Sequence, residues 1–154
     1  MRRLPEIVAL YGQLDALLEA QREEALKAKD IATVERVERR QLINDHAYFV
    51  LCFGQLELEI NDRCADLIRR RKADQDWSRR RGFDMYDADN LRLSFEARTA
   101  LLVDASAGPE KPFRRIMKFM DLRNKAAHGK FDDKGIDVAE IANEFRTLAG
   151  LLAP

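Results

Sequence analysis

Residues 44–71, NDHAYFVLCFGQLELEINDRCADLIRRR, decide the fold class of this chain. The segment is apolar on nearly all sides over residues 47–53 and then becomes amphipathic. Its later apolar positions are Leu56, Ile60, Cys64, Leu67 and Ile68. A helix that is apolar almost all round is typically the central, most buried member of a helical bundle. The sequence therefore predicts a bundle built around this helix.

Helical spacing extends on both sides of this segment. An N-terminal helix is predicted with one buried stripe, formed by Leu4, Ile7, Val8, Tyr11, Leu14 and Leu18. Asp30 suits the N-cap of the next helix, and helical spacing resumes at Leu91, Leu93 and Phe95. No alternation with a period of two is convincing. The fold class is therefore all-α, an up-and-down bundle of about five helices in a single domain, residues 1–154.

Helix starts and stops are clear in the last third of the chain. ASAGPEKP breaks the pattern, and Pro109 and Pro112 suit the first turn of a helix that follows. The inner side of that helix is expected to carry Phe113, Ile116, Met117, Met120 and Ala127. Gly129 suits the position just past its end. Asp137 and Glu140 have the spacing of a capping box, which starts the last helix.

Composition excludes several classes of protein. The 27 basic and 27 acidic side chains cancel, so the total charge does not indicate a strongly basic nucleic-acid binder. The N-terminal stretch lacks a continuous apolar core like that of a signal peptide, and residues 47–53 are too few to span a bilayer. We expect a cytoplasmic protein that is not inserted in a membrane. Cys52 and Cys64 have no further ligands at zinc spacing, and the sequence predicts no metal and no cofactor. His46, just before the apolar run, is interpreted as structural.

Two regions are basic despite the neutral total. Residues 61–82 contain eight Lys or Arg against four Asp, and residues 110–130 contain seven Lys or Arg against two acidic residues. Basic runs are usually solvated surfaces, but the second region could attract phosphates. The candidate RNA-binding residues outside its Arg/His pair are Arg114, Arg115, Lys118, Lys125 and Lys130.

That pair lies in residues 122–130, LRNKAAHGK, where Arg123 and His128 are five positions apart. On a helix this separation turns the two side chains about 140° from each other. Histidine can accept the proton of a ribose 2′-hydroxyl or protonate a leaving oxygen. Arginine can hold a phosphate and stabilise the charge that develops on it. The two residue types are therefore sufficient for metal-free RNA cleavage.

RNKAAH at residues 123–128 is similar to the R-x4-6-H motif of the HEPN superfamily, in which Asn often follows the arginine, as Asn124 does here. The helical architecture and the late position of the motif also resemble that family. The resemblance implies a homodimer whose two motifs form one composite, metal-independent endoribonuclease site. It implies that Arg123 binds phosphate, that His128 is the acid/base residue and that Asn124 is a positioning group. Many members are toxins or antiviral effectors that a partner protein, such as an antitoxin, controls.

Two other functions stay open at this point. In one, the chain is a catalytically silent helical module that binds a protein or nucleotide partner, and Arg123 and His128 anchor a loop or an interface. In the other, the two basic regions bind RNA without cleaving it. This last function is the weakest of the three, because an aromatic content of 8% offers few stacking surfaces for single strands.

Overall fold

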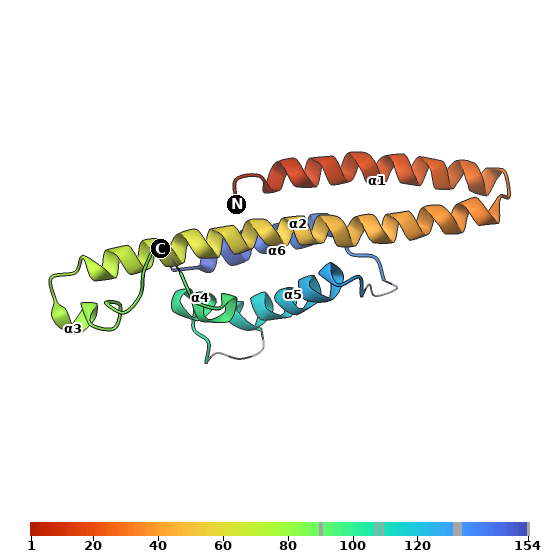
Figure 1. Cartoon of the computed structure of the whole chain (residues 1–154). Coiled ribbons are helices and arrows are strands. Elements are labelled where there is room, and N and C mark those ends of the chain that lie inside the picture. Colours follow the sequence, from red (N-terminus) through yellow and green to blue (C-terminus); the bar gives the residue numbers. More distant parts are fainter. Residues whose placement is uncertain (90, 107, 109, 131–133, 154) are drawn as a thin grey trace. The chain divides into compact units, whose positions relative to one another are not determined.

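The computed structural model describes residues 1–89, 91–106, 108, 110–130 and 134–153. Its described residues are helical or irregular, with no strand among them, which confirms the all-α prediction. The helices are α1 (Leu4–Lys27), α2 (Ile31–Lys72), α3 (Trp77–Arg80), α4 (Phe95–Leu102), α5 (Pro112–Ala127) and α6 (Val138–Leu151) (Figure 1). Five of them correspond to the expected bundle, and α3 is a short helix within the connection that follows α2.

The chain forms two compact units. The first unit comprises Met1–Gln55 and Phe119–Arg146, and the second comprises Leu56–Lys118 and Thr147–Pro154. Three helices, α2, α5 and α6, therefore contribute residues to both units. Gly54 lies in α2 just before the boundary, and a Cβ atom added there would meet nothing within 4 Å.

The first unit has an aromatic core. Phe49 and Phe53 of α2 pack with Phe119 of α5 and Phe145 of α6, at ring-centroid distances of 5.0 to 6.5 Å. These are ordinary separations for tilted and edge-to-face aromatic pairs. Phe49 and Phe53 are almost completely buried, as the apolar run at 47–53 predicted, and so is Phe145 of α6. Ala47 and Leu51 of the same run are exposed, so the run is not buried on all sides.

In the first unit, α1 runs antiparallel to the first part of α2 (Figure 1). Arg22 of α1 donates from Nε to Glu38 of α2 at 2.9 Å, and the two tyrosines Tyr11 and Tyr48 pack at 5.5 Å between ring centroids. The turn between the helices is fixed by Asp30, whose side chain accepts from the backbone N–H of Thr33 at 3.1 Å. This confirms the predicted N-cap of the second helix.

The prediction of one buried stripe on α1 was wrong. Leu4 and Leu18 are buried and Tyr11 is half-buried, whereas Leu14 is 38% exposed. The apolar residues fall on two neighbouring sides of the helix, and only one side packs against α2. Periodicity identifies the helix but cannot tell how many of its apolar sides are covered.

The second unit has a largely aliphatic core. Its fully buried members include Leu56, Ile60, Cys64 and Ile68 of α2, as predicted for the second half of the central helix. Arg63 of α2 donates to the backbone carbonyl of Leu152 at 3.1 Å. The helix expected from Leu91 begins instead at Phe95, because Ser94 caps it by accepting from the N–H of Ala97 at 3.1 Å.

Both cysteines are free, and each is buried. Burial raises the pKa of the Cys52 thiol to about 11, so it behaves as a small apolar group at neutral pH. His46, interpreted as structural, is 1% exposed. None of the described helices is long and apolar enough to cross a membrane.

Candidate functional site

The Arg/His motif occupies the end of α5 in the first unit. The backbone N–H of Gly129 donates to the carbonyl of Ala126 at 3.0 Å, and that of Lys130 donates to Lys125 at 2.9 Å. These two bonds, with Gly129 at φ 70°, define a Schellman motif. Glycine suits this left-handed position because it has no Cβ atom. The structure therefore confirms the predicted helix end and places His128 at the C-cap.

His128 is exposed at this helix end. Its backbone N–H donates to the carbonyls of Asn124 at 3.2 Å and Lys125 at 3.1 Å, so the main chain that carries the imidazole is fixed. The side chain itself extends from the last turn of the helix into solvent. An exposed imidazole on an ordered backbone is available to a ligand or to a second chain.

Arg123 is half-buried one turn earlier on α5. Its Nη1 donates to Oδ1 of Asn124 at 3.0 Å, and its Cζ lies 6.0 Å from the centroid of the Phe53 ring. The aromatic core thus supports the guanidinium by a cation–π contact, and Asn124 orients it. The structure brings Arg123 and Asn124 into direct contact and places His128 on the following turn.

The five other basic candidates are divided between the two units. Lys125 and Lys130 belong to the first unit and are exposed next to the motif. Arg114, Arg115 and Lys118 belong to the second unit, where Arg114 and Lys118 are exposed and Arg115 is half-buried. Only Lys125 and Lys130 are therefore neighbours of Arg123 and His128 within one unit.

The positions of α5 that are buried differ between its part in the second unit and its part in the first unit. Phe113 and Ile116 are buried in the second unit, as predicted, but Ala127 is exposed and its neighbour Ala126 is buried. In the first unit, the side chains of α5 that face inward are those of Phe119, Arg123 and Ala126. Phe119 and Arg123 contact the aromatic core, and Ala126 is buried. The prediction for Ala127 was wrong because it extended the stripe of one unit into the other. Pro112 does begin α5, whereas Pro109 lies outside the described residues.

A buried polar cluster that the sequence did not predict lies in the same unit. Tyr11 of α1 donates its hydroxyl to Oδ1 of Asp45 at 2.9 Å, and the backbone N–H of Ile136 donates to Oδ2 at 3.3 Å. Asp45 thus ties the segment before α6 to α1 and α2. A Cβ atom on Gly135 would lie only 3.0 Å from Oδ2 of Asp45, so a larger residue there would displace the carboxylate by a few tenths of an ångström.

Burial is the main influence on both acidic groups of this cluster. It raises the pKa of the Asp45 carboxyl, while the hydrogen bonds from Tyr11 and Ile136 oppose that rise. Burial and the neighbouring Asp45 both raise the pKa of the Tyr11 hydroxyl. The sequence signal for this cluster was Asp45, an acidic residue just before the apolar run at 47–53.

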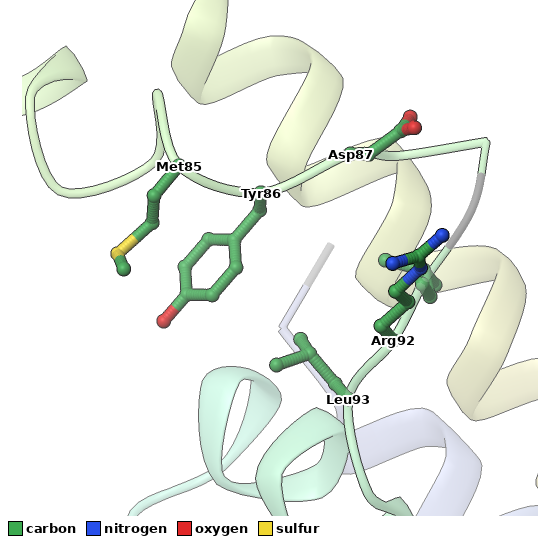
Figure 2. Close-up of a pocket in the computed structure, with 6 residues that line it drawn as sticks. Met85, Tyr86, Asp87, Arg92 and Leu93 are labelled. Carbon is green, nitrogen blue, oxygen red and sulfur yellow. The ribbon is translucent and has the colours of Figure 1, made fainter.

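Both units contain cavities lined by described residues, and the second unit also has one of about 430 Å³ between the end of α4 and the start of α5. In the first unit, a cavity of about 660 Å³ is lined by Asp45, Gly129 and Gly135 together with residues of α2. In the second unit, a cavity of about 390 Å³ is lined by residues of 85–87 and 91–93. Figure 2 shows Tyr86 and Leu93 pointing toward the same space there, with the carboxylate of Asp87 turned away. None of the three linings includes a predicted catalytic residue.

Within the part of the chain that is described, no three His, Cys, Asp or Glu side chains cluster so that they could hold a metal ion. Comparison with protein-family models, curated protein sequences and solved structures gives no significant match to this chain.

Proposed function

We propose that the chain is a metal-independent endoribonuclease of HEPN type that acts as a homodimer. The observation that carries the proposal is the end of α5, where Asn124 orients the Arg123 guanidinium and an exposed His128 follows on the next turn. Lys125 and Lys130 add positive charge beside it. Together these groups supply a phosphate ligand, an acid/base group and electrostatic attraction for RNA.

The proposed reaction is an internal transesterification. The 2′-oxygen of a ribose attacks the adjacent phosphorus, and the bond from phosphorus to the 5′-oxygen breaks. His128 of one copy accepts the 2′-hydroxyl proton, and the partner's His128 donates a proton to the leaving 5′-oxygen. Arg123 holds the phosphate and stabilises its developing charge. The products are a 2′,3′-cyclic phosphate and a 5′-hydroxyl end.

A cleavage assay on a labelled single-stranded RNA tests this proposal. His128→Ala should reduce the cleavage rate by about 10²- to 10⁴-fold, the usual contribution of a positioned acid/base group. A substrate with 2′-deoxyribose at the cleaved position should be inert, because it lacks the attacking oxygen. Arg36→Ala is a matched control for the loss of an arginine, since Arg36 is exposed on α2 in the first unit and donates to Thr33 of the same helix.

Arg123 needs two variants because it also packs on Phe53. Arg123→Ala should lose cleavage, while Arg123→Lys keeps the charge and the contact with the ring but loses the planar, two-pronged grip on phosphate. Circular dichroism identifies a variant that fails to fold. Undiminished cleavage by a folded His128→Ala or Arg123→Lys protein would rule out the proposed roles.

A toxin or antiviral effector acting on cytoplasmic RNA is the cellular role that we propose for such an enzyme, with a controlling antitoxin-like partner. Expression of the wild-type chain alone should then arrest bacterial growth, and His128→Ala should relieve the arrest. Growth arrest that persists in His128→Ala would contradict this role.

A second candidate is a catalytically silent module that binds a protein or nucleotide partner. The contact between Arg123 and Phe53 favours it, because that contact gives the arginine a structural task without any substrate. Under this function, Arg123→Ala lowers the stability of the fold and no RNA is cleaved by any variant. The cleavage assay described above therefore separates the two candidates.

A further inference from the structure

Helix α1 carries two apolar stripes at coiled-coil spacing. The inner stripe, Leu4, Tyr11, Leu18 and Ala25, repeats every seven residues and faces α2. The outer stripe, Ile7, Leu10, Leu14 and Leu17, alternates steps of three and four residues, as the core positions of a heptad do. Leu10, Leu14 and Leu17 are 51%, 38% and 62% exposed. One coiled-coil face of α1 is therefore used within the chain, and the other is not.

Helix α2 has a matching flank. Its residues Asp45 and Tyr48 contact α1, and Phe49 and Phe53 contact α5 or α6. Val37, Asn44 and Leu51, seven residues apart, form a third stripe on α2, which we call the α2 flank. Val37 and Asn44 are buried within the chain, and only Leu51 is exposed. On two right-handed helices that run antiparallel, the outer stripe of α1 and the α2 flank fall on the same side of the pair. The two stripes form one hairpin face.

The hairpin face contains an incompletely satisfied polar group. Asn44 is 8% exposed, and its buried Nδ2 atom has no hydrogen-bond partner within the described residues. Leu51, on the same stripe, is 52% exposed. That Nδ2 atom is already covered by the chain itself, so a second copy would not reach it, and the exposed part of the hairpin face is the outer stripe of α1 together with Leu51.

Charges at the two ends of the outer stripe select the partner. Arg3 continues the stripe before Ile7, and Gln21 and Glu24 continue it after Leu17; Arg3 and Glu24 are both exposed. A second α1 in parallel register would set Arg3 against Arg3 and Glu24 against Glu24. An antiparallel copy pairs Ile7 with Leu17 and Leu10 with Leu14, and places Arg3 opposite Gln21 within one turn of Glu24. The outer stripe is thus complementary to a second copy of itself only when the two α1 helices are antiparallel.

We infer that the hairpin face binds a second copy of this chain, with the two α1 helices antiparallel about a two-fold axis. The two hairpins then form a four-helix bundle whose centre is the outer stripe of each copy. This inference does not depend on RNA cleavage. The interface leaves the end of α5 uncovered, so contact between two Arg/His motifs would require a further interface.

Light scattering coupled to size exclusion tests the interface. The wild-type chain should elute as a dimer or a larger even-numbered assembly, and Leu14→Glu with Leu17→Glu should halve its mass. Ala16→Glu with Ala20→Glu is the matched control, because it adds the same two charges at exposed positions of α1 outside both stripes. A monomeric wild type, or an unchanged mass for the double variant, would overturn the inference.

Disulfide trapping tests the orientation. Mixed Arg3→Cys and Gln21→Cys proteins should form a cross-linked dimer under mild oxidation, while Arg3→Cys alone should not. The two native cysteines are buried and do not interfere. Cross-linking of Arg3→Cys with itself would overturn the antiparallel arrangement. Cleavage assays on the same variants keep the two proposals apart: a monomeric variant that still cleaves RNA through His128 contradicts only the need for a dimer.

Discussion

The inner and outer stripes of α1 have the same kinds of side chain and nearly the same repeat, yet their surroundings differ. Leu18 is 8% exposed and its neighbour Leu17 is 62% exposed. The inner stripe is fixed by long-range contacts to α2, among them the hydrogen bond between Tyr11 and Asp45. Apolar periodicity therefore shows how many sides of a helix could pack against another helix. Whether each side is buried depends on which other helices are present.

The largest expected effect comes from truncating one leucine of each stripe, Leu18 of the inner stripe and Leu17 of the outer stripe. Leu18→Ala should lower the free energy of unfolding by about 2–4 kcal/mol, the usual cost of a cavity in a packed core. Leu17→Ala should cost under about 0.5 kcal/mol in dilute protein, because that side chain is already solvated. Urea titration measures both. The cost of Leu17→Ala should grow with protein concentration if a second copy covers the outer stripe, whereas that of Leu18→Ala should change little.

Tyr11, the polar residue of the inner stripe, should give the next largest change in the free energy of unfolding. Tyr11→Phe removes the hydroxyl that donates to Asp45 and should lower the free energy of unfolding by about 1–3 kcal/mol at neutral pH. The folded-state pKa of Asp45 is already raised by burial, and losing this bond raises it further. Above that pKa the buried carboxylate is ionised and short of a donor, so the cost is greatest there.

As the pH falls through the raised pKa of Asp45, the carboxyl takes up a proton and the cost of Tyr11→Phe should shrink. Chemical denaturation of the wild type and Tyr11→Phe between neutral pH and the ordinary range of an aspartate measures this trend. Asp45→Asn is the control, because the same comparison in that background should show no such dependence. A cost that is constant with pH would show that Asp45 is not the group responsible.

The turn between α1 and α2 determines which stripe faces inward. Loss of the N-cap in this turn should lower the stability by less than the loss of the Tyr11 hydroxyl. Asp30→Ala removes the acceptor for the N–H of Thr33 and should destabilise the first unit by about 1 kcal/mol. Thermal unfolding followed by circular dichroism measures it. Asp30→Asn retains a side-chain oxygen that can accept the same bond, so it should recover most of the loss.

The smallest predicted change is a gain. Lys29 has φ 55°, and the N–H of Asp30 donates to the carbonyl of Ala25 at 2.9 Å, so α1 ends in a Schellman motif with lysine in the left-handed position. Lys29→Gly relieves the Cβ strain and should stabilise the turn by about 0.5 kcal/mol. Gly129→Ala, at the equivalent position after α5, should have the opposite sign. A loss of stability in Lys29→Gly would show that strain is not what limits this turn.

Local signals in the sequence predicted the helices and their ends well. Asp30, Pro112, Gly129 and Asp137 all have the roles expected of them, including the bond from the N–H of Glu140 to Oδ1 of Asp137 at 2.8 Å. Each of these interactions spans only a few residues, so composition and spacing suffice to recognise it. The central helix was predictable from its apolar run, although Leu51 within that run is 52% exposed.

The contacts that support the candidate site were not predictable in the same way. Arg123 lies on Phe53, 70 positions earlier in the chain, and Asp45 joins Tyr11 to Ile136. Such contacts depend on how distant segments pack, which one sequence does not reveal. The motif made Arg123 and His128 the candidate residues at the end of α5, but it did not predict that the aromatic core of the first unit contacts Arg123.

The continuity of α2 has a consequence for amide hydrogen exchange. Helical hydrogen bonds are local, so the second half of α2 can unwind from Lys72 back to Gly54 while the amides from Val34 to Phe53 stay protected. Glycine is the weakest point of a helix interior, and Gly54 lies at the edge of the first unit. Exchange rates along this one helix would therefore separate the opening of the unit that carries Arg123 and His128 from the opening of the other.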